Sequence, residues 1–470
     1  MGRSWGLLAL GALALAARLA CIAVVGDATS GPVTYEHGEI AANLLAGRGF
    51  SCRFLGAEGP TSQQAPLYPL LLAGCYWLLG QGHLAILAIQ LGQALLGSAT
   101  ALLTASLAWS LVPAKRSVGW LAGAVVALYP PHVYMVTHVQ VVTLATFLLT
   151  AALALAARAQ SARTWRGAAF AGLTAGLLLL VDPILALALP WLAALRWMAG
   201  GNSLPAGRRL VQTAVMAGVA VGVVAPWIVR NYWVHAELVF VKSTFGYAFW
   251  QGNNPQSWGT DKVPQPAARQ LLAAAEGASL AEMNRSLWAA RHKTLYIDDV
   301  VLTPADYRQL AAVSEPRRSA MLGRRAWQFV RTQPAAYARL CWNRLRYFLL
   351  LDETNPKTSH PLYRWSSIAW LALTVIGGLS AGRLWKRLWP LAGVFGSLLV
   401  FHTLTITSSR FRMPLEPLSL VWAAAGLLSL AGLARLALAF IGAHKPLILT
   451  GSGRIHHAAL AEPGRSAAPG

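Results

Sequence analysis

Acidic side chains are scarce in this sequence. Its 470 residues include 17 Asp and Glu against 39 Lys and Arg, which gives a formal net charge of +22. Charged residues make up 12% of the chain and hydrophobic residues 56%, whereas a soluble domain carries about 25% charged residues. So little charge does not cover the surface of a soluble protein of this length, and we exclude that class.

Cysteine and nucleotide-binding motifs are also poorly represented. The four cysteines, Cys21, Cys52, Cys75 and Cys341, show no CxxC or Cys/His metal spacing, so neither a zinc site nor a disulfide is predicted. A Gly-rich nucleotide-binding loop is absent from the sequence. Ionisable residues at mid-membrane depth are nearly absent too, which argues against a transporter.

The basic excess has three explanations. Nucleic acid binding is the usual one for a strongly basic chain. A membrane protein explains it better, because Lys and Arg flank membrane spans on the cytoplasmic side. Some of the arginines could also hold a phosphate. We predict no nucleic-acid partner.

Long apolar runs recur along the whole chain. A helix needs about 20 apolar residues to cross a bilayer, and the runs of about that length include residues 7–25, 84–112, 120–134, 210–229, 369–384 and 418–441. The sequence therefore predicts an all-α polytopic membrane protein with about ten transmembrane helices. Arg3 before the first run is typical of an uncleaved signal anchor with its N-terminus inside.

Charge patterning then sets the topology. The apolar run 67–79 is short, and placing it on the outer surface keeps Lys115 and Arg116 inside. Four regions follow: an N-terminal transmembrane module (1–229) with a catalytic first external loop (26–82), an external helical segment (230–363), C-terminal transmembrane helices (364–445) and a disordered tail (446–470). An Ala-, Arg- and Gly-rich composition is typical of a high-GC bacterium, so we expect a multi-pass protein of the bacterial cytoplasmic (inner) membrane.

Two carboxylates in the first external loop are candidates for acid–base chemistry. Glu36 and Glu39 stand three residues apart in a helix predicted after Pro32 and ending near Gly47, so they share one face. Two close carboxylates raise the pKa of one of them, which makes a general base. The alternative is a pair of solvated acids near a helix N-terminus.

Arginines at the predicted outer ends of two spans are candidates for phosphate binding. Arg230 follows one span, and Arg410 and Arg412 follow another. Arginine forks match phosphate oxygens; the alternative is that these side chains snorkel to water. The weaker candidates are Lys242, Arg344 and Arg346.

Other polar residues lie near the same predicted face. A single histidine there is more often structural than catalytic; the four are His37, His132, His138 and His402. Asp182 stands at a span boundary, where a carboxylate is either functional or caps a turn.

Three patches of sequence carry a resemblance to a known family. They are residues 36–50 (EHGEIAANLLAGRGF) with 60–70 (PTSQQAPLYPL), residues 226–232 (PWIVRNY) with 252–255 (GNNP), and residues 410–417 (RFRMPLEP). Together they resemble the GT-C superfamily of membrane glycosyltransferases. The resemblance is to the bacterial branch related to protein O-mannosyltransferases (glycosyltransferase family 39) and to the lipid A aminoarabinose transferase. It covers most of residues 5–440.

The resemblance implies an activity. Such enzymes take a sugar from a polyprenyl-phosphate carrier on the outer membrane face and transfer it, with inversion, to a hydroxyl acceptor. The positions that match the family's roles are Glu36 or Glu39 for the base, Arg230, Arg410 and Arg412 for the carrier phosphate, and His37, Asn253, Asn254, His138 and Asp182 for other substrate contacts. The acceptor, whether lipid, glycan or protein, is not indicated.

Two positions depart from the family pattern. Thr143 stands about where relatives carry an acid, and Asp182 stands where an Arg is common; His138 or Asp182 would have to supply the missing contact. The sequence predicts no firm metal site but leaves open a divalent cation between the carboxylates and the phosphate. Two other functions stay open: a flippase for a lipid-linked saccharide, and an inactive scaffold of the same fold.

Overall fold

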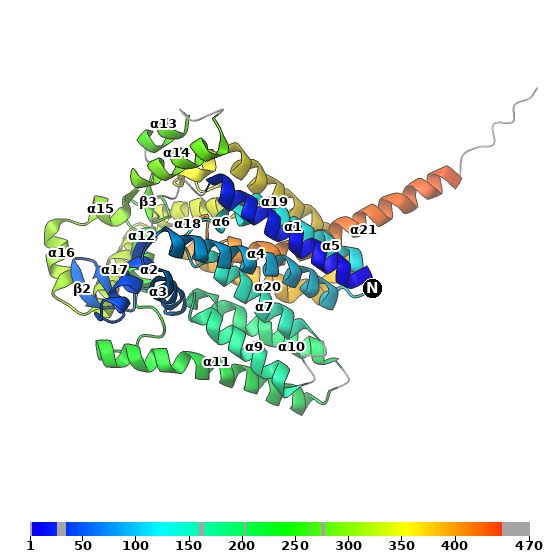
Figure 1. Cartoon of the computed structure of the whole chain (residues 1–470), viewed down its shortest axis with the longest axis horizontal. Coiled ribbons are helices and arrows are strands. Elements are labelled where there is room, and N and C mark those ends of the chain that lie inside the picture. The colour runs from blue at the N-terminus through cyan, green and yellow to red at the C-terminus, as the bar shows by residue number, and fades with distance from the viewer. Residues whose placement is uncertain are drawn as a thin grey trace, which may run out of the picture. The chain divides into compact units, whose positions relative to one another are not determined.

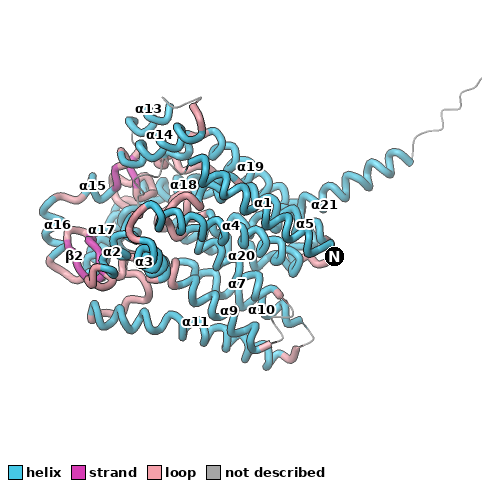
Figure 2. The backbone as a smooth tube through the Cα atoms, in the orientation of Figure 1, coloured by secondary structure: helices cyan, strands magenta, loops and turns pink. Residues whose placement is uncertain are grey.

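The computed structural model describes residues 2–25, 34–158, 164–201, 204–264, 266–273 and 278–443. The chain divides into two compact units, residues 1–429 and residues 430–470. The predicted boundaries at 229 and 363 stay predictions, and the predicted tail (446–470) lies outside the described residues. The all-α class is confirmed, because helices make up nearly all the regular structure (Figure 2).

Helices dominate the first half of the chain. The elements are α1 (Gly2–Val25), α2 (Tyr35–Leu45), α3 (Leu67–Leu79), α4 (His83–Leu111), α5 (Arg116–Leu128), α6 (Pro130–Met135), α7 (Val142–Ala157), α9 (Trp165–Leu179), the 3₁₀ helix η2 (Pro183–Ala188), α10 (Leu189–Gly200) and α11 (Ala206–His235). A short hairpin of β1 (Ser51–Phe54) and β2 (Ala57–Pro60) lies between α2 and α3.

The second half begins with shorter helices and ends with long ones. They are α12 (Phe245–Gly252), α13 (Pro266–Ala273), α14 (Leu280–His292), α15 (Ile297–Val301), α16 (Pro304–Ala311), α17 (Glu315–Thr332), α18 (Pro334–Leu349), the 3₁₀ helix η4 (Pro356–Ser359), α19 (Pro361–Ser380), η5 (Gly382–Leu384), α20 (Trp385–Leu404), η6 (Met413–Leu415) and α21 (Glu416–Ala443). A two-residue ribbon pairs β3 (Lys262–Val263) with β4 (Leu295–Tyr296).

Six of the described helices are long and apolar enough to cross a membrane. Shorter apolar helices accompany them, so a polytopic membrane protein is confirmed, whereas the number of ten spans stays a prediction. Helix α3 has 13 residues, which makes it about 20 Å long and shorter than the roughly 30 Å hydrocarbon core. Its length therefore fits the predicted position on the outer surface.

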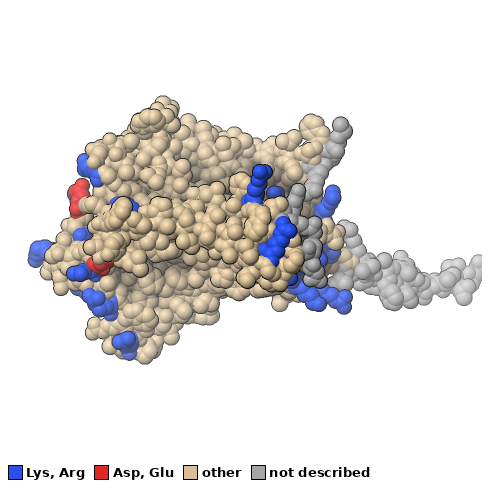
Figure 3. Space-filling view, turned by 90° about the horizontal axis from the view of Figure 1, so that it is seen from below, with Lys and Arg blue, Asp and Glu red and all other residues tan. Residues whose placement is uncertain are grey.

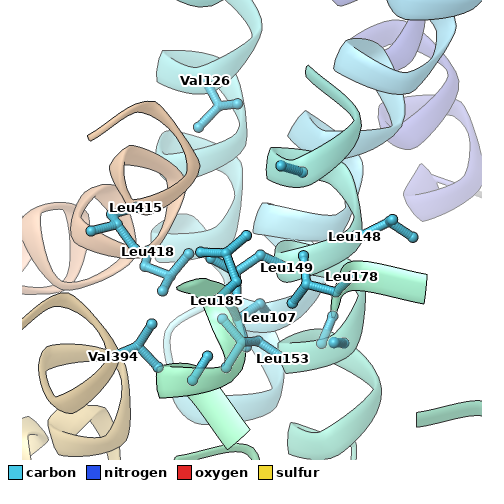
Figure 4. Close-up of a cluster of buried hydrophobic side chains, with 14 of the residues drawn as sticks. Leu107, Val126, Leu148, Leu149, Leu153, Leu178, Leu185, Val394, Leu415 and Leu418 are labelled. Atoms are coloured by element: carbon cyan, nitrogen blue, oxygen red, sulfur yellow. The ribbon is translucent and has the colours of Figure 1, made fainter. Parts of the chain in front are cut away.

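Leucine, valine and alanine side chains fill the space between the long helices. Leu107, Leu149 and Leu178 are fully buried, and they meet residues of α20 and α21 such as Val394 and Leu418 (Figure 4). Glycine permits close helix contact: a Cβ on Gly172 of α9 would lie 2.4 Å from a backbone oxygen of α11. Small residues let membrane helices approach in this way.

One buried arginine interrupts the apolar interior. Arg18 of α1 is fully buried and donates hydrogen bonds to the carbonyl oxygens of Ala14 (2.8 Å) and Ala127 (2.9 Å). Ala127 is the penultimate residue of α5, where carbonyl groups have lost their helical partners. Arg18 is therefore an ionisable residue within a predicted span, and its hydrogen bond to Ala127 joins α1 to the end of α5.

The short helices gather at one end of the first unit. Figure 1 shows α2, α3, α12 and α15–α17 at the end opposite the N-terminus. Figure 3 shows Lys and Arg toward both ends of the helices, Asp and Glu toward one end, and an uncharged belt between them. The candidate loops therefore share one end of the molecule, as the sequence predicts.

Candidate functional site

The first external loop is built around helix α2. Gly47 and Gly49 follow the helix with φ angles of +73° and +70°, a region that favours glycine. The Asn43 side chain donates to the Ser51 carbonyl oxygen (2.8 Å), and the Arg48 guanidinium donates to the Asn43 side chain (2.9 Å). These contacts turn the chain back from α2 into the hairpin and fix the helix that carries Glu36.

The two candidate carboxylates have different surroundings. Glu39 is exposed, and its Oε1 accepts a hydrogen bond from the backbone N–H of Arg53 (2.8 Å), so it holds the hairpin against α2. Glu36 is half-buried, and no hydrogen bond or ion pair engages its carboxylate among the described residues. Of the two, only Glu36 has both oxygens available for a substrate.

Lys242 lies within electrostatic reach of Glu36, and Arg410 lies within reach of Lys242. Burial lowers the pKa of Lys242, while the charges of Asp182 and Glu36 raise it and that of Arg410 lowers it further. Burial raises the pKa of Asp182, which Lys242 and Arg410 oppose. Segments far apart in sequence, namely α2, the start of η2, the loop before α12 and the loop before η6, thus bring their charges together.

The Arg410 side chain has few partners. Its guanidinium lies over the Phe411 ring, 5.4 Å from the centroid, and makes no hydrogen bond or ion pair within the described ranges. Lys242 donates to the side-chain oxygen of Gln64 (3.0 Å) and forms no ion pair. Both side chains are half-buried, so the pair forms a positively charged surface next to Glu36.

Arg230 has a different environment. Its guanidinium donates to the carbonyl oxygens of Thr61 (2.6 Å) and Phe50 (3.0 Å) and packs over the Trp227 ring (4.7 Å). These contacts attach the outer end of α11 to the first external loop. Its phosphate role stays a prediction that no observation supports, and we assign the side chain to loop packing.

Arg412 is also fully engaged. Its Nε donates to Glu416 (2.8 Å), and its other nitrogens donate to three carbonyl oxygens at the end of α18 and to the hydroxyl of Ser367. His132 contacts the second oxygen of Glu416 (2.8 Å). Arg412 is 3% exposed, so this network holds α6, α18, α19 and α21 together, and we do not carry Arg412 into the site.

The asparagines of the GNNP patch are structural as well. Asn253 donates to the carbonyl oxygens of Phe249 and Thr405, and its own oxygen accepts from Arg344 (3.1 Å). Asn254 closes the end of α12 by donating to the Trp250 carbonyl oxygen (2.9 Å). Both are buried, so their predicted substrate contacts gain no support.

The histidines differ among themselves. His37 is buried against the Tyr68 ring (5.2 Å between centroids), and burial with the charges of Lys242 and Arg410 lowers its pKa to about 3. Its Nδ1 finds no partner among the described residues. The His402 ring stacks on Phe411 (4.7 Å), and its Nδ1 is 2.9 Å from the Ile406 carbonyl oxygen. His37 therefore adjoins the cations, whereas His402 supports the loop beneath Arg410.

One further carboxylate fixes the first loop to a distant helix. Glu315, the first residue of α17, accepts hydrogen bonds from the backbone N–H of Ser62 (2.7 Å) and the hydroxyls of Thr61 and Ser243. Ser243 follows Lys242 directly. The loop that holds Glu36 and the loop that holds Lys242 therefore share one anchor.

Possible metal ligands do not cluster in the part of the chain that the structure describes. No group of three or more His, Cys, Asp or Glu side chains that could hold a metal ion occurs among the described residues. Thr143 is buried at the start of α7, so the position that departs from the family pattern lies inside the packed unit. The divalent cation between carboxylates and phosphate stays an untested prediction.

Comparisons with known proteins place this arrangement in a fold. No family model and no curated protein sequence matches the chain. The oligosaccharyltransferase AglB from Archaeoglobus fulgidus, in complex with an inhibitory peptide and a dolichol-phosphate, superposes with a TM-score of 0.53 at 14% identity, over 97% of this chain and 53% of that one. AglB with zinc and sulfate gives a TM-score of 0.52 at 13% identity, over 93% and 51%.

A bacterial enzyme is also similar. ArnT from Cupriavidus metallidurans, bound to undecaprenyl phosphate, matches 95% of this chain and 82% of that one at 16% identity, with a TM-score of 0.40. The chain spans about half the length of AglB. At such low identity the likeness shows the fold alone, and this chain has the GT-C fold of membrane glycosyltransferases that its sequence patches predict.

Proposed function

We propose that this protein transfers a hexosyl or pentosyl group from a polyprenyl-phosphate carrier to a hydroxyl acceptor, with inversion, on the outer face of the cytoplasmic membrane. The observation that carries the proposal is a half-buried carboxylate, Glu36, with no partner among the described residues. Lys242 lies within electrostatic reach of Glu36, and Arg410 lies within reach of Lys242. The sequence patches and the GT-C fold agree with it.

Glu36 is the proposed general base. Inversion requires the acceptor oxygen to attack the sugar carbon from the side opposite the leaving phosphate, and the hydroxyl must lose its proton as the bond forms. A carboxylate whose oxygens are not engaged elsewhere can take that proton, and such assistance contributes about 10²–10⁴ in rate. Glu39 is unsuited in this structure because its Oε1 holds the hairpin.

Lys242 and Arg410 are the proposed ligands of the carrier phosphate. As the sugar–phosphate bond breaks, negative charge grows on the lipid phosphate, and fixed cations stabilise it most where water is scarce. Neither side chain has a carboxylate bonded to it in the described part of the chain. Burial lowers the pKa of Lys242, so an incoming phosphate would favour its protonated form.

A lipid-linked donor is consistent with the ligand bound in one structure of similar fold. The AglB structure contains a dolichol-phosphate, a polyprenyl-type phosphate, and the sequence of this chain has no nucleotide-binding Gly loop. A sugar activated on a lipid phosphate would reach the site from the membrane. The apolar helix α3, which packs beside α2, suits a substrate that enters from the lipid.

Detection of transferred sugar separates the proposal from its two rivals. Membranes that contain the protein would receive polyprenyl-phosphate carrying a radiolabelled sugar, and the label would be followed into cell-envelope glycans, lipids and proteins. Transfer that requires the protein supports the proposal. A flippase would move the label across the membrane without leaving the carrier, and an inactive scaffold would do neither; either result would refute it.

A further inference from the structure

Helix α14 carries three buried nitrogen atoms that find no hydrogen-bond acceptor among the described residues. They are Nδ2 of Asn284, Nε1 of Trp288 and Nη1 of Arg291. Positions 284, 288 and 291 follow a spacing of four and three residues, so the three side chains share one face of the helix. An unpaired buried donor is unfavourable and rare in native proteins. Three of them on one face favour the binding of a group that only accepts hydrogen bonds.

A buried lysine adjoins this face. Lys357 is 6% exposed, and its Nζ makes no hydrogen bond or ion pair within the described residues. It lies 5.2 Å from the centroid of the Tyr134 ring, whose hydroxyl donates to the oxygen of Asn284. Burial and the charge of Arg291 lower the pKa of Lys357 well below its usual range. The charge of Arg291 disfavours the charged form of Lys357, and neither side chain has an ion pair among the described residues, so a bound anion would favour both charges.

Aromatic rings connect these groups. The His138 ring lies 4.7 Å from that of Tyr134 and 5.2 Å from that of Trp288, and Arg291 lies 4.7 Å from the Trp288 centroid. His138 is held at Nδ1 by the Thr137 hydroxyl (3.1 Å), which leaves Nε2 buried and unpaired. The predicted substrate contact of His138 therefore falls in this cluster rather than beside Glu36.

The cluster adjoins the proposed carrier-phosphate site but uses different residues. Asn355, which caps η4 at Lys357, donates to the Ser409 hydroxyl (3.1 Å), and Ser409 precedes Arg410. The charge of Arg410 contributes to the lowered pKa of Lys357. The nearby carboxylate of Asp261 is paired with Lys262 (2.8 Å), so it does not neutralise Lys357. A second anionic group would thus bind close to the first.

We propose that Asn284, Trp288, Arg291 and Lys357 form a second oxyanion-binding site, which holds a phosphate or carboxylate group of the acceptor. Oxyanion oxygens only accept hydrogen bonds, and each of these four side chains offers a donor. The acceptor would then lie between this site and Glu36, with its hydroxyl toward the base. The assignment to the acceptor rests on the proposed function, whereas the binding of an oxyanion does not.

Calorimetric titration of the purified full-length protein with inorganic phosphate tests the site. Lys357→Met and Arg291→Gln should each weaken phosphate binding about tenfold, the size expected for a lost charged hydrogen bond. Arg285→Gln is the matched control, because Arg285 is exposed on the same helix. Equal affinity in all three variants and the wild type would overturn the proposal. Arg291 is half-exposed, so its variant serves if Lys357→Met does not fold.

Competition distinguishes the two sources of the anion. Nanodiscs of phosphatidylglycerol that displace bound phosphate from the wild type, while phosphatidylcholine nanodiscs do not, would support a lipid-borne acceptor group. Absence of displacement would support an acceptor group on a glycan or protein.

In transfer assays Arg291→Gln should raise the KM for the acceptor and leave the KM for the donor unchanged; a raised donor KM alone would refute the acceptor assignment. If no transfer occurs at all while phosphate binding still depends on Lys357, the proposed function fails and the oxyanion site stands.

Discussion

The surroundings of Arg410 and those of Arg412 differ in how many hydrogen-bond acceptors they offer to the guanidinium group. Arg412 donates to a carboxylate, to a hydroxyl and to three carbonyl oxygens, and is almost fully buried. Arg410, two residues earlier, touches one aromatic ring and bonds to no acceptor among the described residues. An arginine with every donor used holds the fold together, whereas one with free donors can bind a ligand. Four predictions test this contrast, from the largest expected effect to the smallest.

Glu36→Gln should abolish most sugar transfer. Loss of a general base lowers the rate by about 10²–10⁴, and the amide keeps the size of the side chain. Glu39→Gln is the matched control on the same helix, with an expected loss of less than tenfold because Glu39 accepts only from the hairpin backbone. Initial rates of label transfer in membranes measure both. Equal losses in the two variants would contradict the distinction drawn between the carboxylates.

Arg412→Met should destabilise the fold strongly. It leaves the buried Glu416 carboxylate facing only His132, and breaking a buried ion pair costs about 3–5 kcal/mol. Arg410→Met, the control two residues away, removes no hydrogen bond and should unfold at the same temperature as the wild type. Thermal unfolding of the purified proteins in detergent compares them. Similar unfolding temperatures for both variants would contradict the claim that Arg412 stabilises the fold and Arg410 does not.

Arg410→Gln and Lys242→Met should each weaken binding of polyprenyl phosphate about tenfold, because each removes one charge-assisted contact. Arg53→Gln is the control, since Arg53 is exposed on the hairpin and pairs only loosely with Glu58 at 3.8 Å. Equilibrium binding of a radiolabelled polyprenyl phosphate in detergent measures the affinities. Unchanged affinity in the first two variants would remove the proposed phosphate role from this pair.

His37 should make the protein less stable in acid. Its pKa falls from 6.5 to about 3 on folding, so the unfolded chain takes up the proton first as the pH drops. The stability contributed by the neutral ring is therefore complete above about pH 6.5 and is lost progressively toward pH 3. His37→Phe keeps a ring against Tyr68 and should flatten this part of the profile of unfolding temperature against pH. An unchanged slope would contradict the assignment.

The sequence predicts the fold class and the position of the site, for physical reasons that are local. Apolar runs of about 20 residues can form only spans in a chain this poor in charge, and Gly47 and Gly49 mark the turn that ends α2. The helix that carries Glu36 is predicted from the glycine that ends it. The short length of α3 is predicted from the short apolar run at 67–79. The resemblance at residues 410–417 also includes Arg410, which the proposed site uses.

The sequence does not distinguish the candidate site residues from those with a structural role, because the hydrogen-bond partners of the structural residues are distant in the chain. Three acceptors of Arg412 are carbonyl oxygens at 348–350, and the partner of Glu39 is a backbone N–H of a hairpin that the polar loop sequence does not predict. The sequence places Lys242 among the weaker candidates for the same reason. The sequence shows a single cation after the apolar residues 238–241, which does not by itself indicate a site. Only the fold brings the charges of Glu36 and Asp182 near it.

The anchor formed by Glu315 has a consequence for how the protein is made. The first external loop leaves the ribosome early, yet Thr61 and Ser62 bond to a carboxylate encoded about 250 positions later. A nascent chain that ends before position 315 therefore inserts its first helices but lacks the anchor that fixes this loop. During synthesis the loop therefore lacks this anchor until about two-thirds of the polypeptide has been translated and α17 has formed.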